Sequence, residues 1–300
     1  MTQIDLDFAA YIRQRKGAEQ SREHGGAAYA YPGDQKVLRT LGKITPVKLA
    51  VEATVRLWQS AAKSQLLGSS VKVTDRQFSE IQQIAVDCAR RLQIAVPTVY
   101  ISPEVGTLNA HTFGTDDDAY IVLNGVLVDH LDADELRFVI GHECAHIQNN
   151  HVVYTTALYY LMYSANVFLR WIVQPAVLAL QSWARRAEIT CDRAGLLCCG
   201  DPAVAERALC KLALGSQKLA RRVDVEEYLK QLEESQRGVG RVFEFTQAHP
   251  YLPKRVAALR FFAQTHFFKQ AQKAPSAPAD AEAAADAANR SLDWCDAEVG

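Results

Sequence analysis

The feature that most constrains this chain is the run Gly-His-Glu-Cys-Ala-His at residues 141–146, which places two histidines four positions apart. On an α-helix, residues i and i+4 lie on one face about one turn apart, so His142 and His146 can direct two imidazoles at one metal ion. Glu143 stands beside them, where its carboxylate can take a proton from a metal-bound water. The pattern therefore predicts a zinc site that still needs a third protein ligand and an open position for water.

The residues before this pattern predict the helix that it requires. Asp132 and Glu135 form an Asp-x-x-Glu capping box, in which the two side chains satisfy amides of the first turn. The apolar residues that follow recur at helical spacing, namely Leu136, Val139, Ile140 and Ile147. We therefore expect a helix over about residues 133–150, preceded by a strand over residues 119–123.

A second pair of acidic residues offers the third ligand. Glu188 and Asp192 are four residues apart and share one face of a predicted helix. One carboxylate can ligate zinc, and the other can accept a hydrogen bond from the far ring nitrogen of a ligating histidine and so fix its tautomer. The alternative is a solvated helix face of alternating charge, because Arg185, Arg186 and Arg193 are close in sequence.

The two patterns together resemble those of a known family. His142-Glu143-x-x-His146 followed by Glu188-x-x-x-Asp192 resembles the gluzincin pattern, and more narrowly that of the HtpX-like and CAAX-prenyl-protease group, metallopeptidase family 48. Three further stretches agree: Asn109-Ala110 before a predicted hairpin, residues 186–194 in the form of a bacterial and plastid branch, and His249-Pro250 followed by Arg255. The resemblance covers about residues 70–262.

The resemblance implies a fold and a ligand set. The fold is mainly α with a small β-sheet (α+β), a zincin-like metallopeptidase domain with an edge-strand hairpin beside the helix of the His-Glu-x-x-His pattern. One Zn²⁺ per chain would be held by His142, His146 and Glu188. Asp192 would be the carboxylate that orients a ligating histidine.

The resemblance also implies how these residues would act on a polypeptide. Zinc lowers the pKa of its bound water towards neutrality, and Glu143 takes a proton as that water attacks a peptide carbonyl. His249 is the expected second stabiliser of the oxyanion; its alternative role is structural, at the start of the last helix. The substrate is expected to bind as an extended strand along the hairpin, where Asn109 offers its side-chain amide.

Composition predicts one catalytic domain with appendages. An apolar fraction of 49% in 300 residues is ample for a substantial core, which we expect over residues 46–272. Residues 1–45 are polar and interrupted by glycine and proline, which predicts a loosely structured N-terminal arm. Residues 273–300 are rich in alanine, proline and acidic residues, which predicts a disordered tail.

The net charge and the cysteine content indicate which binding partners and which cellular compartment to expect. A formal net charge of −1 provides no general attraction to nucleic acid, so no nucleic-acid partner is expected. The first residues lack the apolar stretch of a secretory signal, and the seven cysteines are odd in number without zinc-ribbon spacing. We therefore expect a cytoplasmic protein, whose oligomeric state the sequence does not indicate.

The stretch between the two metal-binding patterns leaves two interpretations open. Residues 152–169 carry no charge and, after Arg170, residues 171–184 are again uncharged. The first part would span about 27 Å as a helix, slightly short of a typical hydrocarbon core. Residues 152–184 therefore predict a hydrophobic helical hairpin that is either buried in the domain or associated with the inner membrane, where membrane-integral relatives place two spans.

These observations favour a zinc-dependent endopeptidase, with protein quality control as a biological role. One alternative is a membrane-attached peptidase subunit of a larger complex. Another is a zinc-stabilised binding protein with little turnover. An intact Glu143 argues against the latter, because a purely structural zinc site fills all four positions with protein ligands.

Overall fold

A computed structural model describes residues 27–57, 63–103, 108–115, 118–163, 167–227, 230 and 252–273. Residues 1–26 of the expected N-terminal arm lie outside the described residues. So do residues 274–300 of the expected disordered tail, and His249.

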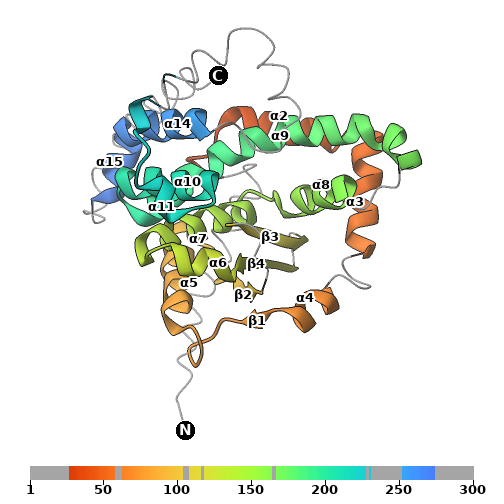
Figure 1. Cartoon of the computed structure of the whole chain (residues 1–300). Helices are drawn as coiled ribbons and strands as arrows, with labels where there is room; N and C mark the ends of the chain where they lie inside the picture. Colours follow the sequence, from red (N-terminus) through yellow and green to blue (C-terminus); the bar gives the residue numbers. More distant parts are fainter. Residues whose placement is uncertain are drawn as a thin grey trace, which may run out of the picture.

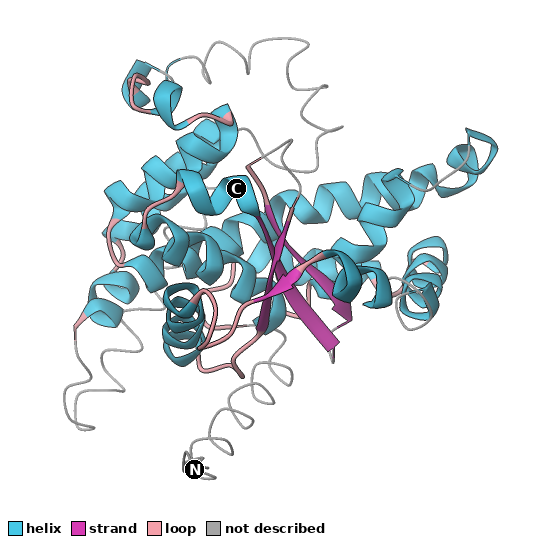
Figure 2. Ribbon diagram, turned by 60° about the horizontal axis from the view of Figure 1, so that its bottom comes forward, coloured by secondary structure: helices cyan, strands magenta, loops and turns pink. Residues whose placement is uncertain are grey.

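The sheet is small, as the sequence predicts, and it is mixed. Its strands are β1 (Val71–Lys72), β2 (Thr98–Ser102), β3 (Ala110–Thr115) and β4 (Asp118–Asn124), arranged in the order β1-β2-β4-β3. Strands β2 and β4 are parallel, whereas β3 and β4 form the antiparallel hairpin. Strand β3 is thus an edge of the described sheet, and Figure 2 shows the strands enclosed by helices.

Helices make up most of the described chain, which confirms the mainly α, α+β class. They are α2 (Pro32–Leu41), α3 (Thr45–Leu57), α4 (Lys63–Ser69), α5 (Ser79–Leu92), α6 (Gly125–His130), α7 (Ala133–Gln148), α8 (Val152–Tyr163), α9 (Val167–Cys199), α10 (Pro202–Leu214), α11 (Gln217–Ala220), α14 (Leu252–Gln264) and α15 (His266–Gln272). Helix α7 lies between the sheet and α9, and it packs on α5, α9 and α10 (Figure 1).

Helix α7 begins as its sequence predicts. The side chain of Asp132 accepts hydrogen bonds from the amides of Asp134 and Glu135, and the carboxylate of Glu135 accepts one from the amide of Asp132 at 2.9 Å. The buried carboxylate of Glu135 also pairs with Lys211 of α10. The capping box therefore fixes the first turn of α7 and also joins it to a neighbouring helix.

Residues 27–45 differ from the expected loosely structured arm. Pro32 occupies the first turn of α2, where a proline has no intrahelical hydrogen bond to lose, so it starts the helix instead of breaking the chain. Asp34 on this helix is fully buried. It accepts hydrogen bonds from Trp183 and Thr190 of α9, and these contacts fix α2 against α9.

The hydrophobic stretch 152–184 forms α8 and the first half of α9. Pro175 lies inside α9, which continues to Cys199 and therefore also carries Glu188 and Asp192. A smaller core forms where α8 and α9 meet α2 and α3, and includes the fully buried Leu180 and Trp183.

Within the described ranges, no helix combines the length and the apolar character that a membrane crossing requires.

Two glycines allow α7 and α9 to approach each other closely. A Cβ added at Gly195 would lie 2.7 Å from the carbonyl oxygen of Phe138, and one added at Gly141 would lie 2.7 Å from the Cβ of Cys198. Real Cβ atoms do not approach other atoms so closely, so a side chain at either position would force the helices apart. The close approach matters because α7 and α9 carry the two patterns that the sequence predicts to bind a metal.

We expect Gly195→Ala to lower the free energy of unfolding by about 1–3 kcal/mol, the usual cost of overpacking a tight core contact. Gly68→Ala in α4 is the matched control, because a Cβ there meets no atom within 4 Å. It should stabilise the protein by about 0.5–1 kcal/mol. Urea unfolding of both variants makes the comparison, and a Gly195→Ala variant as stable as the parent would contradict the packing argument.

Candidate metal centre

Two imidazoles and one carboxylate converge where α7 and α9 meet. His142 and His146 are buried on one face of α7, with ring centroids 5.3 Å apart. Glu188 of α9 faces both rings: its Oε2 is 3.6 Å from His142 Nε2 and its Oε1 is 3.9 Å from His146 Nε2. Two ligand atoms at about 2.1 Å from a tetrahedral zinc ion lie roughly 3.4 Å apart, so the three side chains fit one ion with little adjustment.

The local negative charge also suits a divalent cation. Glu143, Glu188 and Asp192 are all buried beside the two histidines. Burial alone would lower the pKa of His142, but the charges of Glu188, Asp192 and Glu143 and a hydrogen bond to Asp192 raise it instead. The site therefore attracts positive charge, which a metal ion would supply more strongly than a proton.

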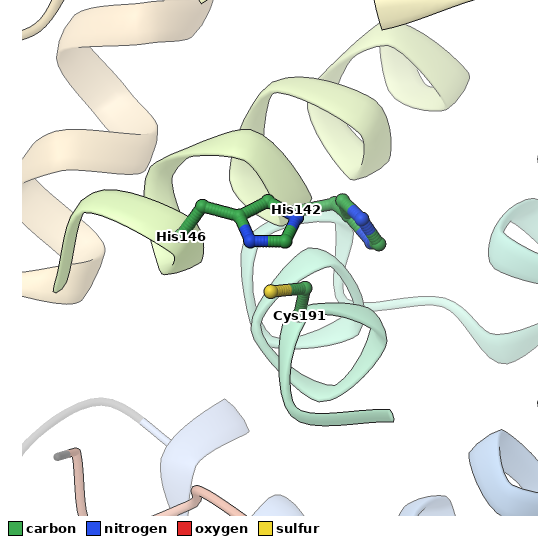
Figure 3. A group of neighbouring side chains, drawn as sticks. All are labelled: His142, His146 and Cys191. Carbon is green, nitrogen blue, oxygen red and sulfur yellow. The ribbon is translucent and has the colours of Figure 1, made fainter. Parts of the chain in front are cut away.

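Cys191 is a competing candidate for the third ligand. Its thiol lies with His142 and His146 in a group whose ligand atoms are all within 4.8 Å of one another (Figure 3). Burial and the nearby Glu188 raise the pKa of Cys191 well above its usual value. A bound metal can deprotonate a thiol, however, so position is the better criterion. The sulfur is 3.8 Å from His151 Nδ1, which in turn lies against Nδ1 of His146. Glu188, in contrast, faces both Nε2 atoms, and it is the stronger candidate.

Asp192 contacts the ring nitrogen of His142 that does not face Glu188. Its Oδ1 is 3.0 Å from His142 Nδ1, and its carboxyl group is almost fully buried. Burial would raise the pKa of Asp192, but the charge and hydrogen bonds of Arg255, together with His142, hold the pKa below its usual value. An ionised Asp192 can only accept, so His142 donates its Nδ1–H and keeps the Nε2 lone pair free.

Arg255 of α14 holds the two carboxylates of α9 together. Its Nε and Nη2 donate to Asp192 at 2.8 and 2.7 Å, and its Nη1 lies 3.1 Å from Glu188 Oε2. In the sequence, Arg255 stands out only as part of the His-Pro element, and no function was expected of it. A guanidinium of this kind offsets the cost of burying two acidic groups one helical turn apart.

Glu143 is fixed by the edge strand. The hydroxyl of Thr112 on β3 donates to Glu143 Oε2 at 2.7 Å. Thr112 was not predicted from the sequence, although strand alternation offers a signal: residues 110, 112 and 114 share one side of the strand. The contact aims the proposed base from the side on which a strand-like substrate would lie.

Asn109 is exposed immediately before β3, and its carbonyl accepts the amide of Asn124. Because of this pairing, the main-chain N–H and C=O groups of Asn109, and of every second residue after it, point towards β4. The main-chain groups of Ala110, Thr112 and Gly114 point away from β4, to the outer edge of β3. The amide of Gly114 is engaged there by Thr156 of α8 at 3.2 Å. Ala110 and Thr112 thus present backbone groups next to Glu143.

Two other histidines differ from the candidate ligands His142 and His146. His111 on β3 packs edge-on against Phe113, and burial lowers its pKa to about 4, so it is neutral near pH 7. His249, the expected oxyanion stabiliser, lies outside the described residues, and its role stays a prediction.

Comparisons with known proteins agree with this geometry. The family model described as peptidase family M48 matches residues 75–263. The plastoglobule-localized metallopeptidase 48, chloroplastic, of Arabidopsis thaliana is 33% identical over 169 residues, which is 55% of this chain and 49% of that protein. A protease HtpX homolog of Bifidobacterium longum is 27% identical over 178 residues, 49% of this chain and 57% of that protein. The chain thus spans about half the length of these curated relatives. No solved structure matches.

The choice between Glu188 and Cys191 can be tested with two single variants. We expect Glu188→Gln to weaken zinc binding by more than about 100-fold, beyond the roughly 10- to 100-fold loss typical of changes around the ligands. Cys191→Ser should bind zinc within a few-fold of the parent protein. Competition with a chromophoric chelator measures both affinities, and the opposite ranking would assign the third ligand to the thiol.

Proposed function

The chain belongs to peptidase family M48, and on that premise we propose that it is a zinc-dependent endopeptidase in which Glu143 is the general base. The observation that carries this proposal is the convergence of both Nε2 atoms of the α7 histidines on the Glu188 carboxylate, with Glu143 alongside. A metal-dependent peptidase needs ligands on one side and a base within reach of the attacking water.

The residues divide the chemistry between them. Zinc, when held by His142, His146 and Glu188, supplies Lewis acidity that brings the pKa of a water molecule towards neutrality. Glu143, held by Thr112, takes the proton of that water and returns it to the leaving amine. His249 is proposed to stabilise the oxyanion.

The substrate is proposed to be a polypeptide bound as an added strand along β3. The outward-facing main chain of Ala110 and Thr112 can pair with an extended peptide, and the exposed Asn109 can bind a peptide amide through its side chain. Thr112 links the two functions, because its backbone lies at the edge while its hydroxyl holds Glu143. Such pairing selects extended backbone of any sequence, which suits a role in protein quality control.

A zinc-stabilised binding protein is the main competing function, and Glu143 separates the two. We expect Glu143→Gln to bind zinc as the parent does but to lose about 100- to 10,000-fold in hydrolysis rate, because the amide cannot accept the proton. Cleavage of an unbiased peptide library by metal-loaded protein measures the rate, with zinc content determined on the same samples. Glu80→Gln, an exposed change on α5, is the control for the loss of one carboxylate. Equal hydrolysis by the Glu143→Gln variant would exclude Glu143 as the base.

A second candidate function is that of a peptidase attached to a membrane surface, within the cytoplasmic and inner-membrane location expected from the sequence. Tyr159 and Met162 of α8 and Leu178 of α9 support it, because these large apolar side chains are 44%, 42% and 44% exposed. Gln181 of α9 contacts the sulfur of Met162, so the last turn of α8 lies against α9 at this point. A paired apolar surface of this kind can insert shallowly into a lipid interface.

Membrane attachment predicts that the protein floats with vesicles of phosphatidylethanolamine and phosphatidylglycerol in a density gradient. The double variant Met162→Ser/Leu178→Ser should lose most of this binding and keep the peptidase activity. Leu219→Ser, which changes a 52%-exposed leucine on α11, should float like the parent. Absence of flotation for the parent protein would remove this candidate and leave the peptidase proposal intact.

A further inference from the structure

A buried carboxylate from the N-terminal segment reaches the metal centre through a histidine. Asp34 on α2 precedes the family-matched region, which begins at residue 75. Its side chain is fully buried, and its Oδ2 lies 3.1 Å from His151 Nε2. His151 Nδ1 lies 3.3 Å from Nδ1 of His146. A continuous chain of polar contacts therefore runs from α2 to the proposed metal ligand.

Asp34 is held as an acceptor. Trp183 Nε1 donates to its Oδ1 at 2.8 Å, and the hydroxyl of Thr190 donates to its Oδ2 at 2.7 Å. Both oxygens of Asp34 thus already accept a hydrogen bond, which favours the ionised carboxylate. An ionised carboxylate accepts hydrogen bonds and donates none, so His151 must present Nε2–H to it.

That requirement sets the direction of each hydrogen bond along the chain. A neutral imidazole has one N–H and one lone pair, so His151 with hydrogen on Nε2 offers the lone pair of Nδ1. His146 Nδ1 lies 3.3 Å from this lone pair, closer than the weakly donating Cys191 thiol at 3.8 Å. His146 therefore donates its Nδ1–H to His151 and keeps the lone pair of Nε2, the atom that faces Glu188. Reversal at any one contact would place a proton on His146 Nε2 and block metal binding there.

We propose that Asp34 and His151 are positioning residues that fix the tautomer and the ring orientation of the metal ligand His146. The inference rests on the proposed zinc site. Each proposed histidine ligand then has a carboxylate that orients it. Asp192 orients His142 directly, and Asp34 orients His146 through His151. It also makes α2 part of the metal centre, although α2 lies outside the matched family region.

The surrounding contacts explain how so distant a segment is placed accurately. The amide of Ala27 donates to Asn149 Oδ1 at 2.9 Å, that of Tyr31 donates to Thr190 Oγ1 at 3.1 Å, and Arg193 donates to the carbonyl of Tyr29 at 3.2 Å. Residues 27–34 are thereby tied to the end of α7 and to α9. By linkage, zinc binding should in turn stabilise the docked segment.

The test is a zinc affinity measured in the full-length protein by chelator competition, together with the melting temperature without and with zinc. Asp34→Asn should weaken zinc binding about 10- to 100-fold, because its amide can donate to His151 Nε2 and reverse the chain of hydrogen bonds. Trp183→Phe is the matched control: it removes a different hydrogen bond to Asp34 but keeps an aromatic ring packed on His151. It should lower the melting temperature of the zinc-free protein without changing the zinc affinity.

Variants at His151 test whether this residue orients His146 or only stabilises the fold. The amide oxygen of His151→Asn takes the place of the imidazole Nδ1 and can accept the Nδ1–H of His146 without help from Asp34, so this variant should retain zinc affinity within a few-fold. His151→Phe has a ring but no acceptor, and should lose about 10- to 100-fold. In the double variant Asp34→Asn/His151→Asn, the effect of Asp34→Asn on zinc affinity should disappear, as a double-mutant cycle requires for two residues in one chain of contacts.

Three results would overturn the proposal, and they can be distinguished. If the parent protein binds zinc and Asp34→Asn binds it equally well, Asp34 is a structural residue and the zinc site stands. If Asp34→Asn does not fold, equal zinc affinities of His151→Asn and His151→Phe would likewise exclude a positioning role. If the parent itself binds no zinc, the proposed peptidase site fails, and its positioning residues fail with it.

Discussion

The structure depends on burying three carboxylates at the junction of α7 and α9. Glu143, Glu188 and Asp192 are each at most 5% exposed, and isolated buried carboxylates are strongly destabilising. Arg255 from α14 and the imidazole of His142 compensate two of them, and Thr112 hydrogen-bonds the third. Because each compensating group comes from a different element, the site assembles only when α7, α9, α14 and β3 are all in place. A divalent cation would complete the same charge balance.

The rest of the fold keeps α7, α9 and β3 close to one another. Gly141 and Gly195 remove the side chains that would separate α7 from α9, and the capping box at Asp132 fixes where α7 starts. The hairpin then places β3 along α7, so that one edge strand can face both Glu143 and a peptide. The geometry of the candidate site is thus a consequence of close helix packing and of the position of one strand.

Local sequence patterns predicted what depends on local structure. The position of α7, the shared face of His142 and His146, and the pairing of Glu188 with Asp192 follow from helical periodicity, and the hairpin follows from its turn. Asp34 and His151 could not be predicted in this way, because the contact between them joins residues far apart in sequence and neither has a recognisable motif. Pro32 shows a different failure: the sequence interpretation treated it as a break, whereas its place in the first turn makes it a helix start. His249 is a prediction that the described residues do not test.

The uncharged stretch before Glu188 has a structural role that its composition alone did not reveal. Helix α9 is apolar in its first half and charged in its second, so the packing of one half determines where the other half lies. Leu180 and Trp183 are fully buried against the elements of the smaller core, and Trp183 also donates to Asp34. Glu188 and Asp192 follow Trp183 by one to three turns of the same helix. A rigid helix transmits this anchoring, so the described part of the hydrophobic stretch fixes the carboxylates that face the two histidines, whatever its exposed outer end contacts.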